Sequence, residues 1–271
     1  MTMTAKELGE RIKSKGTMLC VGLDTDSERL PDSVRRGVSG PEAVYQFNKR
    51  IIDATAPYCV AYKPNLAFYE AMGSEGLSIL GRTVEYLRLN CPSHFLIADA
   101  KRGDIGNTAK LYAKTLFETF GFDAATVNAY MGVEAVQPFL EYPGRFAIVV
   151  ALSSNPSAAD FQFALQDGMP LYEALMRKMM AISTPDQLMF VAGATKAGLF
   201  SRIRSFCPDN FLLVPGVGAQ GGSAEEVIRS GANANGGLLI NSSRAILYAS
   251  SGEDFAEAAA AVASRTARWG G

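Results

Sequence analysis

The sequence predicts an α/β protein folded as a single (β/α)8 barrel, the TIM-barrel architecture, over residues 1–271. Eight apolar runs of strand length recur along the chain, and segments with helical spacing of apolar residues lie between them. No shift in composition and no Pro/Gly/Ser-rich linker divides the chain. Because the runs are hydrophobic at nearly every position, we expect both faces of the sheet to be covered. A count of eight strands favours a barrel over the alternative, a doubly wound sheet.

The expected strands and helices alternate in the order that βαβ units require. The expected strands are residues 18–24, 59–65, 94–101, 124–130, 145–153, 189–195, 212–218 and 237–243. Helical apolar spacing occurs at residues 41–57, 76–90, 108–121, 171–182, 223–232 and 255–269. The polar, turn-rich residues 25–41 predict a long loop after the first strand. Residues 154–170 predict a mobile lid after the fifth strand.

The composition is that of a folded globular protein, since 48% of the residues are hydrophobic and 20% are charged. A net charge of −1 provides no overall field to attract nucleic acid or an anionic membrane surface. No apolar run approaches the ~18 residues of a membrane span, and residues 1–16 lack the apolar core of a secretory signal. We therefore expect a cytoplasmic protein that binds neither nucleic acid nor membranes. Any anion that it binds must be held by local groups.

The cysteines and the histidine do not form a recognisable metal or redox motif. The four cysteines are scattered without CxxC spacing, and His94 is the single histidine. We therefore expect reduced thiols and no bound metal.

Polar residues stand at the carboxyl ends of the expected strands, where barrel enzymes gather their active sites. The third strand ends in Asp99, Lys101 and Asp104, and the second ends in Lys63. Residues two apart on a strand face the same side, so Asp99 and Lys101 should both project into the barrel mouth. Gly103 would permit a sharp exit from the strand, and the pair at 107–108 could cap the next helix.

These charges have two interpretations. One is a simple strand-end ion pair beside a capped helix. The presence of Lys63 favours the other, an alternating array of Lys63, Asp99, Lys101 and Asp104 in which each charge keeps its neighbours ionised. Such an array offers a fixed ammonium beside a fixed carboxylate. It suits a reaction that builds negative charge on carbon and then protonates that carbon.

A glycine loop after the seventh strand predicts a phosphate site. Residues 215–222 contain G-x-G-x-x-G with Gly216 and Gly218. In a dinucleotide-binding fingerprint, however, this motif follows an early strand, and an acidic residue stands about 20 residues after it. Here the eighth strand ends in Arg244 without an acid. Many barrels bind phosphate in the loops after strands seven and eight. Backbone N–H groups, a helix opening at 223–226 and Arg244 could hold a monophosphate; a tight turn beside a surface arginine is the alternative.

Together these segments resemble the orotidine 5′-phosphate decarboxylase family, in particular its longer bacterial type. The resemblance is carried by "DAKRGDIGNT", by "YKPN" with Lys63, by "GLDTD" with Asp24, by "PGVGAQGG" and by Arg244. It extends from the first strand to the eighth. It implies decarboxylation of orotidine 5′-phosphate to UMP, the last step of pyrimidine synthesis, without a cofactor or a metal. It also implies a homodimer with shared active sites.

The resemblance further implies a role for each site residue. Lys101 would stabilise the developing C6 carbanion and donate the proton that replaces CO₂, and Asp99 would lie against the departing carboxylate. The remaining roles are ribose binding by Lys63 and Asp24, entry of Asp104 and Thr108 into the partner's site, pyrimidine contact by Ser153, and phosphate binding by Gly216, Gly218, Gln220 and Arg244. One departure is Ser243, which stands where many members have a glycine.

Two other functions fit parts of this pattern. The related sugar-phosphate decarboxylases and hexulose-phosphate synthases share D-x-K-x-x-D but use magnesium and an acid on strand two, where this chain has Lys63. A barrel that merely senses a nucleotide monophosphate would not need the charged array. Decarboxylation therefore remains the favoured hypothesis.

Overall fold

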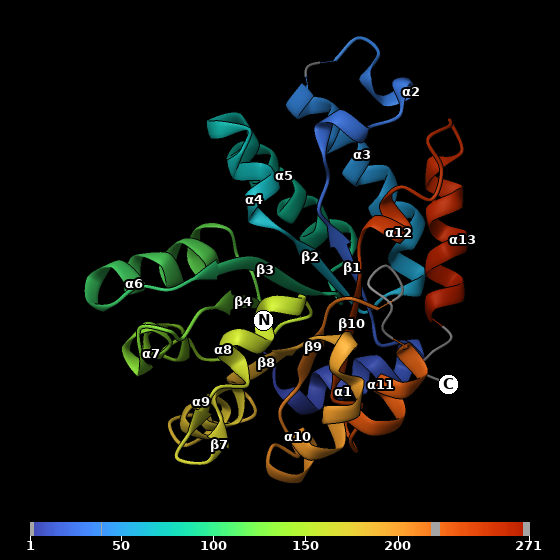
Figure 1. The fold of residues 1–271 in the computed structure, drawn as a ribbon. Coiled ribbons are helices and arrows are strands. Elements are labelled where there is room, and N and C mark those ends of the chain that lie inside the picture. Colours follow the sequence, from blue (N-terminus) through green and yellow to red (C-terminus); the bar gives the residue numbers. More distant parts are fainter. Residues whose placement is uncertain (1–2, 39, 218–222, 268–271) are drawn as a thin grey trace.

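The computed structural model describes residues 3–38, 40–217 and 223–267, and their strands close into a parallel barrel (Figure 1). Neighbouring strands follow the order β1-β10-β9-β8-β5-β4-β3-β2. The barrel strands are β1 (Leu19–Leu23), β2 (Ala61–Pro64), β3 (Phe95–Arg102), β4 (Ala124–Val127), β5 (Phe146–Leu152), β8 (Leu188–Ala192), β9 (Leu212–Val214) and β10 (Leu238–Ser242). All eight predicted strands and the predicted fold class are confirmed.

The strands are buried at consecutive positions, which explains why their sequences lack an apolar/polar alternation. Every residue of β1, β2, β4, β8, β9 and β10 is buried. The barrel interior covers one face of each strand, and the surrounding helices cover the other (Figure 1). The core is therefore continuous from the barrel interior to the helix layer.

The helices surround the barrel, and those predicted from apolar spacing are present. The helices are α1 (Ala5–Lys15), α2 (Asp32–Arg35), α3 (Gly40–Thr55), α4 (Leu66–Glu70), α5 (Gly73–Asn90), α6 (Gly106–Lys114), α7 (Gln137–Leu140), α8 (Ala159–Gln162), α9 (Leu171–Met180), α10 (Phe200–Phe206), α11 (Ala224–Gly231), α12 (Arg244–Leu247) and α13 (Phe255–Ala267). The one predicted at 108–121 is α6 followed by a π-helical turn over Thr115–Thr119, and the predicted end at 268–269 lies outside the described residues. Within the described residues, none of the helices has both the length and the apolar character needed to cross a membrane.

Helix α1 was not predicted, although its start carries a recognisable signal. Thr4 and Glu7 form a reciprocal capping box that opens the helix. The Ala5 N–H donates to Asp186 Oδ1 at 2.7 Å, just before β8. A Cβ at Gly9 would lie 2.7 Å from the carbonyl oxygen of Asn235, just before β10, so α1 packs closely there. The helix therefore lies against the amino-terminal end of the barrel, away from the mouth.

The predicted lid after β5 has secondary structure of its own. It contains α8 and the short hairpin of β6 (Leu165–Gln166) and β7 (Met169–Pro170). Phe161 and Leu165 within it are 74% and 72% exposed. Ala158 is buried and Phe163 packs against the core, so the segment is anchored to the barrel while part of its apolar surface faces solvent.

Candidate active site

A cavity of about 330 Å³ opens at the carboxyl ends of the strands. Its lining includes the predicted site residues Asp24, Lys63, Asp99, Lys101, Ser153, Gly216 and Arg244. These residues come from opposite sides of the barrel and from widely separated parts of the sequence. Their convergence on one cavity matches the position of active sites in barrel enzymes.

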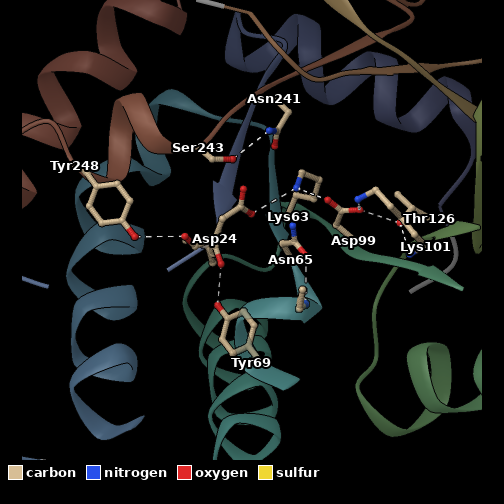
Figure 2. A network of polar contacts seen from close by, with 12 residues as sticks. Asp24, Lys63, Asn65, Tyr69, Asp99, Lys101, Thr126, Asn241, Ser243 and Tyr248 are labelled. Carbon is tan, nitrogen blue, oxygen red and sulfur yellow. Dashed lines mark hydrogen bonds and ion pairs between the residues drawn. The ribbon is translucent and has the colours of Figure 1, made fainter. Parts of the chain in front are cut away.

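Four alternating charges form a chain across one side of this cavity (Figure 2). Lys63 Nζ lies 2.9 Å from Asp99 Oδ2 and 3.6 Å from Asp24 Oδ1. Lys101 Nζ donates to the other carboxylate oxygen of Asp99 at 2.6 Å. The side chains of Lys63 and Asp99 are 4% and 10% exposed, whereas that of Lys101 is 56% exposed. Lys101 is thus the cation with access to both the cavity and solvent.

The charges stabilise one another against the cost of burial. Burial alone would lower the pKa of Lys63, but the carboxylates of Asp99 and Asp24 outweigh this effect and raise its pKa above the usual value. Burial would likewise raise the pKa of Asp99, but Lys63 and Lys101 lower it far below its usual value. Both side chains therefore stay charged over the ordinary pH range. The site is a preformed electrostatic network.

The end of β3 is less regular than the sequence predicts. Lys101 has a φ of +46°, and the register between β3 and β4 shifts between Ala98 and Arg102. Asp99 and Lys101 still share the mouth, as predicted. Their mutual position depends on this irregularity and on Thr126 of β4, whose hydroxyl bonds to both residues. Thr126 was not among the predicted site residues.

Asp104 and Thr108 lie outside the cavity of their own chain. Asp104 Oδ1 accepts a hydrogen bond from the Ile105 N–H at 2.8 Å, and within this one chain the fourth charge of the network is Asp24. Thr108 is exposed on α6. The predicted capping of this helix by residues 107–108 is wrong, because α6 begins at Gly106 and those residues already lie in its first turn.

Gly103 serves close packing rather than an unusual backbone conformation. A Cβ at Gly103 would lie 2.7 Å from the carbonyl oxygen of Asn128. Asn128 itself, a polar residue near the end of the strand predicted at 124–130, is exposed and does not line the cavity. The chain can therefore leave β3 directly beside β4 only because position 103 has no side chain.

The predicted phosphate side of the cavity is partly described. Gly216, with a φ of +93°, and Arg244, the first residue of α12, both line the cavity. Ser223 caps α11 by accepting from the Glu226 N–H at 3.2 Å, as the sequence predicts for this helix start. The guanidinium of Arg244 makes no hydrogen bond or ion pair with the residues that the structure describes. Gly218 and Gln220 lie outside the described residues.

Ser243, the departure from the family pattern, is accommodated by β1. A Cβ at Gly22 would collide with the Ser243 side chain, so the glycine leaves room for the serine. Ser243 Oγ accepts from Asn241 Nδ2 at 3.2 Å. The Asn241 Oδ1 atom is buried at the cavity wall and lacks a hydrogen-bond partner among the described residues. It remains available as an acceptor for a ligand.

Ser153 lines the cavity and is held by the lid. Its N–H donates to Gln162 Oε1 at 2.8 Å, and Gln162 Nε2 donates to its hydroxyl oxygen at 2.8 Å. The hydroxyl in turn lies 2.7 Å from Asn155 Oδ1. Contacts from α8 therefore fix the orientation of this side chain.

The closed barrel and the charged network at its mouth define an α/β-barrel enzyme that can stabilise negative charge and deliver a proton. A sequence model of the orotidine 5′-phosphate decarboxylase / HUMPS family matches residues 17–261. The chain belongs to this family, and it is an enzyme of the decarboxylase type.

Named relatives cover nearly the whole chain. The orotidine 5′-phosphate decarboxylase of Christiangramia forsetii is 52% identical over 261 residues, which are 96% of this chain and 95% of that protein. The protein of the same name from Porphyromonas gingivalis is 50% identical over 267 residues, or 98% and 96% of the two chains. The solved structure of Leishmania donovani OMP decarboxylase has a TM-score of 0.81 at 31% identity, with 99% of each chain covered.

Proposed function

We propose that this protein converts orotidine 5′-phosphate to UMP and CO₂, the last step of de novo pyrimidine synthesis, without a cofactor or a metal. The observation that carries the proposal is the alternating network of Asp24, Lys63, Asp99 and Lys101 in the barrel mouth. Two relatives that share about half of their residues with this chain support the proposal, because they are named for this reaction.

The network can perform the chemistry with protein groups alone. With the phosphate at Arg244 and the pyrimidine near Ser153, the substrate carboxylate would face Asp99. The C6–carboxylate bond breaks, CO₂ leaves, and the electron pair remains on C6. The Lys101 ammonium stabilises this charge and transfers a proton to C6. Because its side chain is 56% exposed, Lys101 can then regain a proton from solvent.

Lys63 supports the decarboxylase branch of the family over the magnesium-dependent branch. Its ammonium lies between the carboxylates of Asp24 and Asp99, at 3.6 and 2.9 Å. A lysine at this position supplies the positive charge that the related enzymes take from a metal. Together with Lys101, it balances the charge of the two carboxylates with protein groups alone.

An assay with a chelator tests the proposal. The purified protein should turn over orotidine 5′-phosphate, followed by the fall in ultraviolet absorbance, at the same rate with and without EDTA. Activity that disappears with EDTA and returns with magnesium would contradict the metal-free proposal. Binding of UMP without any turnover of orotidine 5′-phosphate would identify the protein as a nucleotide sensor instead.

The phosphate role of Arg244 predicts a binding defect on its removal. The Arg244→Ala variant should show a KM raised roughly 10- to 100-fold, with a smaller change in kcat, because one charge-assisted hydrogen-bonded pair is lost. Steady-state kinetics measures both constants. Arg265→Ala, an exposed arginine on α13, is the matched control and should leave both unchanged. An unaltered KM in Arg244→Ala would remove this residue from the phosphate site.

We propose in addition that two copies of the chain share their active sites, with Asp104 and Thr108 entering the partner's cavity. Both residues lie outside the cavity of their own chain. Large apolar side chains are exposed nearby, just before and on α6 and after β4, namely Ile105, Leu111, Tyr112, Tyr130 and Met131, which are 36% to 89% exposed. Such clusters typically mark interaction surfaces.

We also propose that residues 1–271 form one domain in the cytoplasm. The eight barrel strands run from Leu19 to Ser242 and close on one another, and both α1 and α13 contribute residues to the core around them. The four cysteines are buried and unpaired, as expected in a reducing compartment.

A further inference from the structure

The hydroxyl of Thr126 joins the two residues at the centre of the site (Figure 2). Thr126 lies on β4, is 1% exposed and lines the cavity. Its Oγ1 accepts a hydrogen bond from the Lys101 N–H at 2.9 Å and donates one to Asp99 Oδ1 at 3.0 Å. The single donor of this buried hydroxyl is therefore used on Asp99, and one of its lone pairs is used on Lys101.

The first bond holds an unusual backbone conformation. Non-glycine residues at positive φ are uncommon, and Lys101 has a φ of +46° where the β3–β4 register shifts. The Lys101 N–H is bonded to the Thr126 side chain at this irregularity. Without the hydroxyl it would lack a protein partner in a partly buried position, which is costly. Thr126 thus fixes the backbone from which the Lys101 side chain extends.

The second bond fixes the carboxylate. Asp99 Oδ1 accepts from both Thr126 and Lys101 Nζ, while Oδ2 accepts from Lys63 Nζ. The carboxylate plane is therefore set by donors on three different strands. Removal of Thr126 would leave the two lysines to set it, and their long side chains are more flexible than a β-branched threonine.

We propose that Thr126 is a positioning residue for the decarboxylation, in that its hydroxyl sets the geometry of Lys101 and Asp99 relative to C6. This inference rests on the roles proposed above for those two residues. Because the hydroxyl acts on the reacting side of the cavity and not on the phosphate side, its loss should lower kcat much more than it raises KM. Misplacement of a catalytic group by about 1 Å can cost about 100-fold in rate.

Two substitutions at this position test the inference. Thr126→Val keeps the shape and branching of the side chain but removes the hydroxyl, and its kcat should fall by about 100-fold. Thr126→Ser retains the hydroxyl and should restore most of the lost kcat. Affinity for UMP should stay close to that of the unaltered protein in both variants. The Lys101 amide should exchange its proton faster in Thr126→Val, measured by hydrogen exchange of the peptide that contains it.

Thr55→Val is the matched control. Thr55 is equally buried, and its hydroxyl also makes two hydrogen bonds, to the Ile51 carbonyl and the Tyr62 hydroxyl, away from the cavity. This variant should lose thermal stability to a similar extent but keep its kcat. If Thr126→Val kept its kcat, or if Thr126→Ser were as slow as Thr126→Val, the inference would be overturned. Failure of the proposed function is distinguishable, because the unaltered protein would then show no turnover at all.

Discussion

Replacement of Lys101 by alanine is expected to lower kcat by about 10⁴-fold or more, since it removes both a proton donor and a positioned positive charge. Lys101 Nζ is the exposed end of the network, 2.6 Å from Asp99 Oδ1, and we propose that it is the cation next to the substrate carbon. Binding of UMP should persist, because the phosphate site proposed at Arg244 does not include Lys101. Steady-state kinetics gives the rate, and calorimetric titration with UMP gives the affinity.

Two further lysine variants show whether the loss of activity comes from the missing proton donor. Lys101→Arg keeps a positive charge but offers a poor proton donor, because a guanidinium does not lose its proton in proteins. Its kcat should therefore stay far below that of the unaltered protein. Lys178→Ala, an exposed lysine on α9, should have no effect on kcat. Turnover of Lys101→Ala close to the unaltered rate would exclude Lys101 as the proton donor.

The fold was predictable because the strands of a barrel are buried on both faces. The runs at 94–101 and 145–153 read as apolar at consecutive positions, and they form β3 and β5 nearly as predicted. Helix α1 was not predicted although Thr4 and Glu7 carry a capping signal, because Leu8 and Ile12 are its only large apolar residues and give too short a helical pattern. Strand ends were less predictable. The run at 212–218 yields a strand that ends at Val214, where the glycine-containing loop begins.

The part of the candidate site formed by residues at the carboxyl ends of the strands was predictable from the sequence. Lys63, Asp99 and Lys101 converge because their strands are adjacent in the barrel. The identity of the fourth charge was not predictable from spacing. Asp104 is near Lys101 in sequence, but the chain turns away at Gly103, and Asp24 lies beside Lys63 because β1 pairs with β2.

Thr126 was missed for a physical reason. Its role depends on a register shift between β3 and β4 and on the positive φ of Lys101, and neither is encoded by hydrophobic periodicity. The available signal was a polar residue inside the apolar run at 124–127, two positions before Asn128. Residues two apart on a regular strand face the same side, so Thr126 and Asn128 should both point towards the mouth. Of the two, only Thr126 lines the cavity.

Replacement of Asp99 by asparagine should be the most damaging isosteric change to both activity and stability. Asparagine cannot neutralise Lys63, whose ammonium would keep only the more distant carboxylate of Asp24, at 3.6 Å. Breaking a buried ion pair by removing one partner typically costs about 3–5 kcal/mol of unfolding free energy. The substrate carboxylate would also meet an uncharged group in place of Asp99. Chemical denaturation and steady-state kinetics measure the two losses.

The same substitution should also make the unfolding free energy depend on pH between about pH 7 and pH 10. In that range the ion pair of Asp99 and Lys63 gives the unaltered protein no such dependence. In the unaltered protein the lowered pKa of Asp99 gives stability that is lost only as pH falls below about 4, and the raised pKa of Lys63 gives stability that is lost only above about 10. In Asp99→Asn, burial should dominate and lower the pKa of Lys63. The unfolded chain then binds more protons than the folded chain, so the unfolding free energy should rise between about pH 7 and pH 10.

A double variant separates the effect of the unpaired Lys63 ammonium from the other effects of Asp99→Asn. Asp99→Asn with Lys63→Met removes both partners, and an apolar side chain of similar length replaces the unpaired ammonium. Because removing both partners of a buried pair costs less than removing one, the double variant should be more stable than Asp99→Asn alone. It should also lose the rise in unfolding free energy between about pH 7 and pH 10, which comes from Lys63. Its activity should stay low, since the network is gone. If Asp99→Asn were as stable as the unaltered protein at every pH, the buried pair would not hold Lys63 in its charged form.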